Sequence, residues 1–350
     1  MQAELLEAEV VDRVQQAIAG RTPLSIRGGG SKAFYGRTCQ DEVLDVAGHR
    51  GDIRYEPSEL VFTARAGTPL VEIEALLVAN NQMLPFEPPH FSPRATLGGM
   101  VAAGLSGPRR PWGGSVRDTV LGVKLINGRG EVLRLGGQVM KNVAGYDLSR
   151  LMVGALGTLG VLLEVSVKVL PFPAEERTRV FELDAASAAA RQIAWGRLPL
   201  PLSATLVHGG RLFVRLSGGP QGVRAACASM GGEEADAAIW GAAREQTLAF
   251  FRTDQPLWRI SLPPAAPALP GEGLREWGGA LRWLVSDESA EHIRQRAAAL
   301  GGHATLFRGH DGAAAVFHPL PPALLALHQR VKQALDPDGL FNPGRLYPEL

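Results

Sequence analysis

Three glycine-rich segments are the residues in this sequence best suited to chemistry, because backbone amides without a neighbouring Cβ can approach an anion closely. The first, Arg27-Gly28-Gly29-Gly30-Ser31-Lys32, follows a strand-like stretch and has a cationic residue at each end. The second covers residues 96–104 and is expected to be a loop that opens into a helix of small residues. The third covers residues 154–160. Together they favour a dinucleotide-like ligand held through its phosphates.

Glycine alone does not establish a site, since tight turns and close packing of a loop under a sheet also require it. The first segment is not a Walker A loop, because no Gly-Lys-Ser or Gly-Lys-Thr occurs in the chain. It also does not match the GxGxxG pattern that opens a helix in dinucleotide-binding folds. The phosphate-binding interpretation therefore rests on all three segments taken together.

Charge and cysteine content exclude several other functions. The 350 residues carry 36 Lys and Arg against 35 Asp and Glu, so no basic field favours nucleic acid. The only cysteines, Cys39 and Cys227, form no CxxC pair, which excludes a thiolate zinc site, an iron–sulfur cluster and a disulfide framework. We expect a reducing compartment and no metal centre.

The elements expected around the glycine segments alternate between helix and strand. An amphipathic helix is expected at residues 7–19, and residues 23–27 predict a strand that leads into the first segment. A strand at residues 61–66 precedes Thr68, which is expected to cap the next helix. Further strands are expected at residues 120–126, 131–135 and 161–169, the first two joined by the hairpin turn Asn127-Gly128-Arg129-Gly130.

From residue 178 onward, alanine-rich helices appear and glycines become sparse. Two successive sets of strands and helices predict a smaller ferredoxin-like α+β domain. Strands are expected at 179–183, 204–207, 211–216, 257–261, 280–285 and 304–307, helices at 185–195, 221–230 and 289–300, and a loop at 262–273. Pro171 and Pro173 suggest a division into domains at 1–172 and 173–320, with residues 321–350 forming a helix and a tail that return to the first domain.

The order of several motifs resembles that of a known family. After the first glycine segment come Thr96-Leu97-Gly98-Gly99, Arg117-Asp118-Thr119-Val120, Gly157-Thr158-Leu159-Gly160 and Phe341-Asn342-Pro343-Gly344. This succession resembles the PCMH-type FAD-binding domain of the vanillyl-alcohol oxidase superfamily. The stretches at residues 141–151 and 341–347 more narrowly resemble the FAD-binding E subunits of bacterial glycolate oxidase, also called glycolate dehydrogenase.

The resemblance implies an α+β fold, with a PCMH-type FAD-binding domain and a smaller cap domain, and FAD as cofactor. It implies that the first and second segments bind the FAD pyrophosphate through backbone amides, that residues 157–161 lie along the adenine and ribose, and that Asn342 approaches the isoalloxazine. The cofactor-binding residues implied in this way are Arg27, Gly28, Gly29, Gly30, Ser31, Lys32, Thr96, Leu97, Gly98, Gly99, Met100, Gly104, Gly145, Asp147, Gly157, Thr158, Gly160, Val161 and Asn342.

Two departures from the superfamily pattern affect how FAD is held. Many relatives attach the flavin covalently to a His at the end of the first segment, where this chain has Ser31, so non-covalent FAD is expected. Relatives often have Gly-Ser-Glu before Gly-Thr-Leu-Gly, whereas this chain has Gly154-Ala155-Leu156. A carboxylate that would contact the ribose is therefore missing.

No acid–base constellation identifies catalytic residues. Catalytic relatives carry a His-x-Gly-Asp-Gly-Asn-x-His pattern, of which Gly309-His310-Asp311-Gly312 keeps only the beginning. A hairpin between residues 304–307 and 314–317 accounts for it better than a metal site on His303, His310 and His318, and would place His318 opposite Thr305. Arg109-Arg110 are expected in an exposed loop. Trp195, Trp240, Trp258, Trp277 and Trp283 form either core or a protein interface.

Three functions remain open. The preferred one is a flavin-bearing component of a glycolate oxidase complex, not fully active alone, with the resemblance implying the catalytic, FAD-binding D subunit and the iron–sulfur F subunit as partners. The others are a self-sufficient FAD-linked 2-hydroxy-acid dehydrogenase and a scaffold that has lost its flavin, which the intact glycine segments argue against. The acidic N-terminus and the lack of a long apolar run favour a cytoplasmic location, with membrane contact only through the complex.

Overall fold

A computed structural model of the chain describes residues 5–39, 41–137, 147–309 and 315–350. The first half is built on a five-stranded antiparallel sheet with the strand order β3-β4-β8-β6-β7. These strands are β3 (Arg54–Glu56), β4 (Val61–Arg65), β6 (Val120–Ile126), β7 (Val132–Gly136) and β8 (Val161–Lys168). The predicted hairpin is confirmed, since Oδ1 of Asn127 accepts hydrogen bonds from the amides of Arg129 and Glu131.

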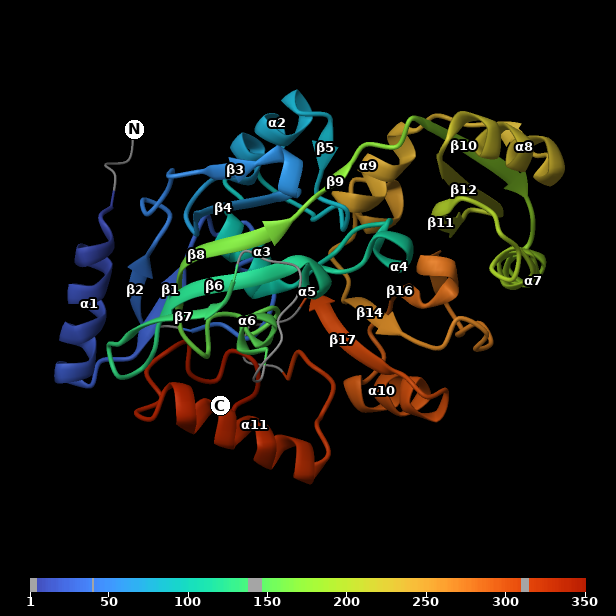
Figure 1. Ribbon diagram of the computed structural model, residues 1–350. Helices are drawn as coiled ribbons and strands as arrows, with labels where there is room; N and C mark the ends of the chain where they lie inside the picture. The colour runs from blue at the N-terminus through green and yellow to red at the C-terminus, as the bar shows by residue number, and fades with distance from the viewer. Residues whose placement is uncertain (1–4, 40, 138–146, 310–314) are drawn as a thin grey trace.

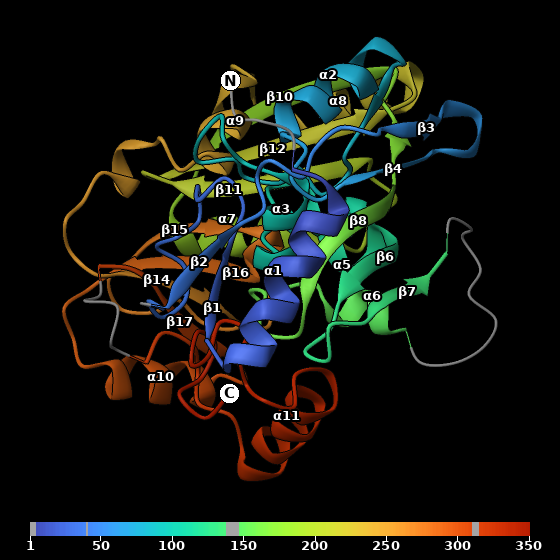
Figure 2. The ribbon, with the colours of Figure 1, turned by 90° about the vertical axis from the view of Figure 1, so that its left-hand side faces the viewer.

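A smaller parallel pair, β1 (Leu24–Arg27) and β2 (Glu42–Asp45), lies beside this sheet. The predicted N-terminal helix is α1 (Glu7–Gly20), which packs next to the pair (Figure 2) and buries Val10 and Val14 in a cluster with Leu24 and Phe341. Strand β1 ends at Arg27, so the first glycine segment begins where the strand leaves this cluster.

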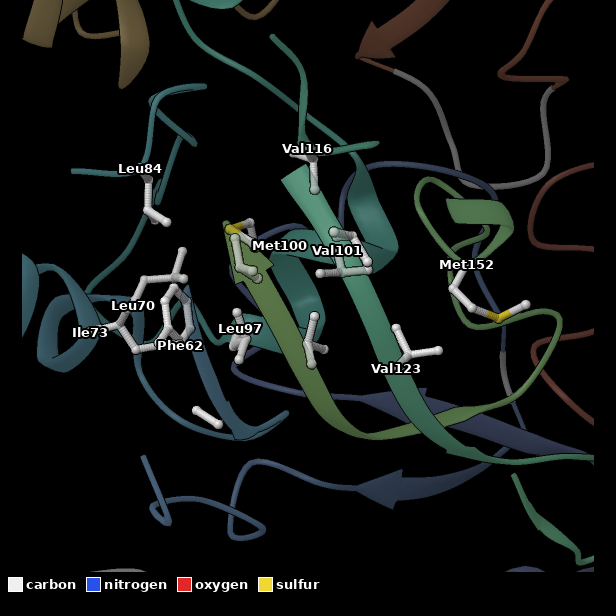
Figure 3. Packing of buried hydrophobic residues seen from close by; sticks show 14 of the residues in the cluster. Phe62, Leu70, Ile73, Leu84, Leu97, Met100, Val101, Val116, Val123 and Met152 are labelled. Atoms are coloured by element: carbon white, nitrogen blue, oxygen red, sulfur yellow. The ribbon is translucent and has the colours of Figure 1, made fainter. Parts of the chain in front are cut away.

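The second glycine segment forms α3 (Leu97–Ala103), which confirms the predicted helix of small residues, and Oγ1 of Thr96 caps it by accepting from the amide of Gly99. The apolar side of α3 packs on the five-stranded sheet, where Figure 3 shows Leu97, Met100 and Val101 against side chains of β4, β6 and α2. This packing fixes the helix between the sheet and the first glycine segment.

Helix α2 (Leu70–Ala79) begins one residue later than predicted. Pro69, not Thr68, occupies its cap position, because the buried hydroxyl of Thr68 accepts a hydrogen bond from the amide of Gly51. The expectation that Thr68 caps this helix was therefore wrong. The remaining elements of this half are short: β5 (Gln82–Met83), β9 (Leu170–Pro171), η1 (Pro57–Glu59), α4 (Arg110–Gly113), α5 (Val116–Thr119) and α6 (Leu148–Leu151).

The second half forms one eight-stranded antiparallel sheet with the order β13-β10-β12-β11-β15-β16-β14-β17. Its strands are β10 (Glu175–Glu182), β11 (Leu202–His208), β12 (Arg211–Gly218), β13 (Glu233–Glu234), β14 (Leu257–Ser261), β15 (Glu272–Glu276), β16 (Leu281–Val285) and β17 (His303–Arg308). Its helices are α7 (Ala185–Trp195), α8 (Pro220–Met230), α9 (Ala238–Arg244) and α10 (Ala290–Ala299), with single turns η2 (Ala249–Phe251) and η3 (Trp277–Gly279).

The strand order of this sheet resolves into two ferredoxin-like units joined edge to edge. Strands β10 to β13 take the spatial order fourth, first, third, second, and strands β14 to β17 repeat that order in mirror image. The second unit has a loop in place of the first helix. The two units meet through β11 and β15, with Val207 opposite Arg275. The expected α+β cap is confirmed, and its two sets of elements share one sheet.

Sequence reasoning missed β15, which begins at the end of the predicted loop 262–273 and continues to Glu276. The apolar pattern that predicts a buried strand is absent here, because the strand buries two charged residues, Arg275 and Glu276. Arg275 is paired with Glu272, and Glu276 accepts a hydrogen bond from the indole of Trp283. Helix α9 was missed as well.

Buried charges join the two halves, which lie side by side in Figure 1. Arg109, expected in an exposed loop, is 7% exposed and pairs with Glu87 at 3.2 Å and with Glu176 of β10 at 2.5 Å. Arg215 of β12 reaches the same Glu87 at 2.8 Å. The exposed-loop expectation for Arg109 is therefore wrong, because its guanidinium is shared between acids of both halves. The tryptophans named above are buried and belong to the core of the second half.

The C-terminal helix α11 (Pro322–Leu335) lies below the first half in Figure 1. Its only buried residue, Lys332, donates from Nζ to Asp336 at 2.6 Å and to the carbonyls of Thr158 and Phe341 at 2.8 Å each. The tail then pairs with β1, since the amide of Leu24 donates to the carbonyl of Leu340. The division into domains at residues 172 and 320 stays a prediction.

Candidate functional site

A cavity opens between β1, the start of α3 and the third glycine segment, and it brings the three segments together. Its walls include these predicted residues: Arg27, Gly28, Gly29, Gly30, Ser31, Lys32, Thr96, Gly98, Gly99, Gly157 and Gly160. Ile26 on the cavity wall donates its amide to Oδ1 of Asn342, a residue 316 positions later in the chain. The C-terminal tail thus supports the wall that β1 forms.

The first glycine segment presents a run of free amides to this cavity. In the part of the chain that the structure describes, no amide from Gly28 to Lys32 donates a hydrogen bond. Buried or half-buried amides are ordinarily paired, so a run without partners indicates a place where a ligand or water accepts. Consecutive amides around a glycine turn form an anion-binding concavity.

The amides at the start of α3 differ, because each already has a partner. Leu97 donates to Thr68, Gly98 to Ala66, Gly99 to the hydroxyl of Thr96, and Met100 to the carbonyl of Thr96. The family resemblance implied that this segment also binds the FAD pyrophosphate through its amides. In the structure these amides already donate hydrogen bonds to Ala66, Thr68 and Thr96. Among the described residues, the amides without an acceptor belong to the first segment.

Close packing explains why glycine is needed at several of these positions. A Cβ on Gly29 would lie 1.5 Å from the carbonyl oxygen of Arg94, and one on Gly98 would lie 2.8 Å from Cβ of Ala66. Gly157 has a φ of +74°, and a Cβ there would lie 2.6 Å from Nδ2 of Asn342. The glycines therefore keep the walls close together and leave the amides at the cavity surface.

Positive charge surrounds the free amides. Arg27, Lys32 and Arg345 all line the cavity. Burial lowers the pKa of Lys32 to about 8, while the nearby Glu245 carboxylate opposes that shift. Within the described residues, the hydrogen bonds of Lys32 Nζ are long, at 3.4 Å to Oγ of Ser31 and 3.5 Å to the carbonyl of His90. A bound phosphate would favour the charged form of this amine.

Several predicted residues lie away from the cavity wall. Leu97, Met100 and Val161 are buried in apolar clusters, and the hydroxyl of Thr158 donates to the carbonyl of Ala155. Gly104 ends α3 with a φ of +64°. Asp147 caps α6 by accepting from the amide of Arg150. Asn342 is 1% exposed and bonded to Ile26 and Leu156, and Gly145 lies outside the described residues.

The structure adds lining residues that sequence reasoning missed. Apolar walls come from Ile26, Ala33, Val43, Val46, Ala66, Ala102, Ala103, Leu156 and Leu162, and polar ones from Ser25, Thr38, Cys39 and Arg345. No local motif marks these positions. Val43 and Val46 reach the site only because β2 pairs in parallel with β1.

The structure describes two of the three histidines considered as metal ligands, His303 and His318. The rings of His303 and His318 lie 6.4 Å apart, and Nδ1 of His318 accepts from the amide of Ala304, so the expectation that His318 faces Thr305 was wrong. Residues 315–318 form no strand, although Leu306 donates to Val316. His310 and the predicted turn at residues 311–312 lie outside the described residues. Among the described residues, no three metal-binding side chains gather.

Comparisons with known proteins decide the family. The family model described as "FAD binding domain" matches residues 6–136, and that of "FAD linked oxidases, C-terminal domain" matches residues 308–346. Glycolate oxidase subunit GlcE of Escherichia coli K12 is 53% identical over 97% of both chains. The chain belongs to the GlcE family. The resemblance seen in the motifs is thereby confirmed.

More distant relatives match only part of this GlcE-family chain, or only its fold. Glycolate oxidase subunit GlcD of Bacillus subtilis is 32% identical over 49% of this chain and 37% of its own length. D-Lactate dehydrogenase of Archaeoglobus fulgidus is 29% identical over 43% of this chain and 33% of its own. A solved alkyldihydroxyacetonephosphate synthase superposes over 97% of this chain and 75% of its own with a TM-score of 0.67 and 15% identity, which confirms the expected fold.

None of the helices in the described ranges has the length and apolar character needed to span a bilayer.

Proposed function

We propose that this chain is the flavin-bearing component of a complex that oxidises glycolate to glyoxylate, with electrons passed to an iron–sulfur partner. The observation that carries the proposal is the run of free amides from Gly28 to Lys32 on a cavity wall in a chain of the GlcE family. The substrate and the expected partners are inferred from the resemblance to glycolate oxidase. The partners are the catalytic FAD-binding protein and the iron–sulfur protein of that complex.

The cavity residues fit FAD. The amides of Gly28 to Lys32, with the side chains of Arg27 and Lys32, would hold the pyrophosphate, and the apolar walls would exclude water from the rings. Ser31 offers no imidazole for a covalent link, so binding is non-covalent. FAD, when bound, supplies the acceptor for a hydride from a 2-hydroxy acid.

The position of the cysteines supports electron transfer to a partner. Cys39 lies on the wall of the cavity, whereas Cys227 lies on α8 of the second sheet. Two separate thiols cannot hold an iron–sulfur cluster, which takes several cysteine ligands. We therefore assign the onward electron relay to a second protein, and location at the cytoplasmic face of the membrane would follow from that complex.

The absorption spectrum of the purified chain tests the cofactor. We expect a flavin spectrum and full release of the flavin into the supernatant on acid precipitation. Flavin that stays with the precipitate would contradict non-covalent binding, and a folded chain that does not take up added FAD would contradict the proposal itself.

Deletion of this chain from the assembled complex tests its role. Loss of glycolate oxidation is expected, with recovery when the purified chain is added back. Full activity without the chain would overturn the proposal. Bleaching of the flavin in the isolated chain by glycolate would favour a self-sufficient dehydrogenase instead.

A further inference from the structure

Helix α11 has an unusual pattern of burial. Among its 14 residues only Lys332 is buried, whereas Leu324 and Leu327 are 40% and 46% exposed. Val331 and Leu335, which pack against the core of the first half, are only partly buried. A helix on a core ordinarily buries a stripe of apolar side chains and keeps its charged ones in water. The buried lysine therefore needs an explanation other than hydrophobic anchoring.

All three donors of the Lys332 ammonium have an acceptor. Nζ donates to Oδ2 of Asp336 at 2.6 Å and to the carbonyls of Thr158 and Phe341 at 2.8 Å each. Asp336 is 1% exposed, and its oxygens also accept from the amides of Leu340 and Phe341. A buried ion pair is often no more stabilising than apolar residues of the same size. The purpose of this pair therefore lies in what it holds in place.

One of the two carbonyls lies directly behind the wall of the cofactor cavity. Thr158 stands between Gly157 and Gly160, which line the cavity, and its own hydroxyl donates to the carbonyl of Ala155. Glycine restricts the backbone least, so a segment that contains two glycines needs contacts that fix its path. The bond from Lys332 supplies such a contact in the middle of the segment.

The other carbonyl belongs to the C-terminal tail. Phe341 precedes Asn342, whose side-chain amide is bonded to Ile26 and Leu156, and both of these residues line the cavity. Nζ of Lys332 thus joins the third glycine segment to the part of the tail that supports the wall formed by β1. Lys332 is not one of the described residues that line the cavity, so it acts without touching a bound molecule.

We propose that Lys332 is a positioning residue for the cofactor, which holds Thr158 and Phe341 at a fixed separation and thereby sets the affinity of the cavity for FAD. The inference rests on FAD occupying this cavity, as in the proposed function. Walls that are already in place bind more tightly than walls that must be ordered on binding. By the reciprocity of coupled equilibria, bound FAD should in turn hold α11 more firmly.

Asp336 separates this role from a purely structural one. In the double variant Lys332→Met with Asp336→Asn, no buried charge is left unpaired, so much of the stability lost in Lys332→Met should return. The bond to Thr158 stays absent, so FAD affinity should remain at least about tenfold below that of the wild type, the equivalent of one lost hydrogen bond from a charged group. Asp336→Asn alone should lower stability but keep most of the FAD affinity, because even a neutral amine retains donors for both carbonyls.

Titration of the purified full-length chain, freed of flavin, with FAD measures the affinity. It is done where far-UV circular dichroism shows each variant to be folded, so that stability and affinity are read separately. The visible circular dichroism of bound FAD reports the asymmetry of its surroundings and should change in the double variant. Arg330→Met, at an exposed position of the same helix, is the matched control and should leave affinity and spectrum unchanged.

Hydrogen exchange measures the reciprocal effect. Amides of α11 should exchange more slowly when FAD is added to the wild type, and much less so in the double variant. Wild-type FAD affinity in the folded double variant would overturn the inference and leave Lys332 a structural role alone. A wild-type chain that takes up no FAD would refute the proposed function, and this inference with it, whereas FAD uptake that is equal in the wild type and the double variant would refute this inference only.

Discussion

Asn342 donates a hydrogen bond of 2.6 Å from Nδ2 to the carbonyl of Leu156, which lies 186 positions earlier in the chain. Its Oδ1 accepts from the amide of Ile26 at 2.7 Å. One buried amide therefore ties the C-terminal tail to both the first strand and the third glycine segment. Its φ of +43° is one that Asn and Asp tolerate better than other residues with a side chain.

Asn342→Asp should separate the two bonds. Aspartate keeps the acceptor for Ile26 and tolerates the backbone angle, but it cannot donate to Leu156 when ionised. We expect a loss of about 1–3 kcal/mol in the free energy of unfolding, from an unpaired buried group, and weaker FAD binding. Urea unfolding and FAD titration measure the two effects. A variant with wild-type values in both would show that this bond does not support the cavity.

Gly29→Ala should disrupt the cofactor cavity. The added Cβ would lie 1.5 Å from the carbonyl oxygen of Arg94, so the first segment must move away from the loop before α3. FAD uptake should be lost or fall at least a hundredfold. Gly222→Ala on α8 is the matched control, because a Cβ there meets nothing within 4 Å. It should leave FAD binding unchanged and raise the stability by about 0.5–1 kcal/mol.

Lys332→Met should destabilise the chain by about 3–5 kcal/mol, because Asp336 would remain buried and charged without its cation. The double variant Lys332→Met with Asp336→Asn should recover part of the loss. Lys168→Met, at a partly buried position of β8, serves as the control and should cost much less. Urea unfolding of the wild type, Lys332→Met, Asp336→Asn and the double variant gives the coupling energy between the two residues. Additive losses would show that Lys332 and Asp336 do not act as a pair.

Glu276 should make stability depend on pH. Its pKa is raised by burial from the ordinary 4.5 to about 7, with Trp283 and Arg259 lowering it and Glu87 raising it. The folded state therefore holds the proton more tightly than the unfolded chain, so this stability is complete below pH 4.5 and is lost as the pH rises through 7. The limit is about 3 kcal/mol.

The measurement compares wild type with Glu276→Gln in urea from about pH 5 to about pH 8.5, a range that brackets the shifted pKa. Glutamine does not titrate, so the variant should lose less stability than the wild type over this range. Parallel curves for the two proteins would mean that Glu276 has an ordinary pKa. Asp254→Asn, at an exposed position of the 252–256 loop, serves as the control because it removes a carboxylate without touching the buried surroundings of Glu276.

The sequence by itself determined the local elements and the three segments that meet at the cavity. Periodic apolar residues, glycines and turn residues act over a few positions, so α1, the 127–130 hairpin and α7 were predictable. The motif order was enough to indicate the family and its cofactor. It also indicated the absence of ligands for a cluster, since that depends only on which residues are present.

Only the tertiary structure decided which groups are free. The first amides of α3 are paired with Ala66 and Thr68, while those of residues 28–32 are without partners among the described residues, although both segments contain adjacent glycines. The same holds for the arginines, since Arg109 is paired across the two halves and Arg259 is left without an acid in the described chain. Hydrogen bonds and ion pairs between residues far apart in sequence depend on the packing of two sheets. Adjacent residue types do not encode that packing, which is why these pairings could not be seen in the sequence.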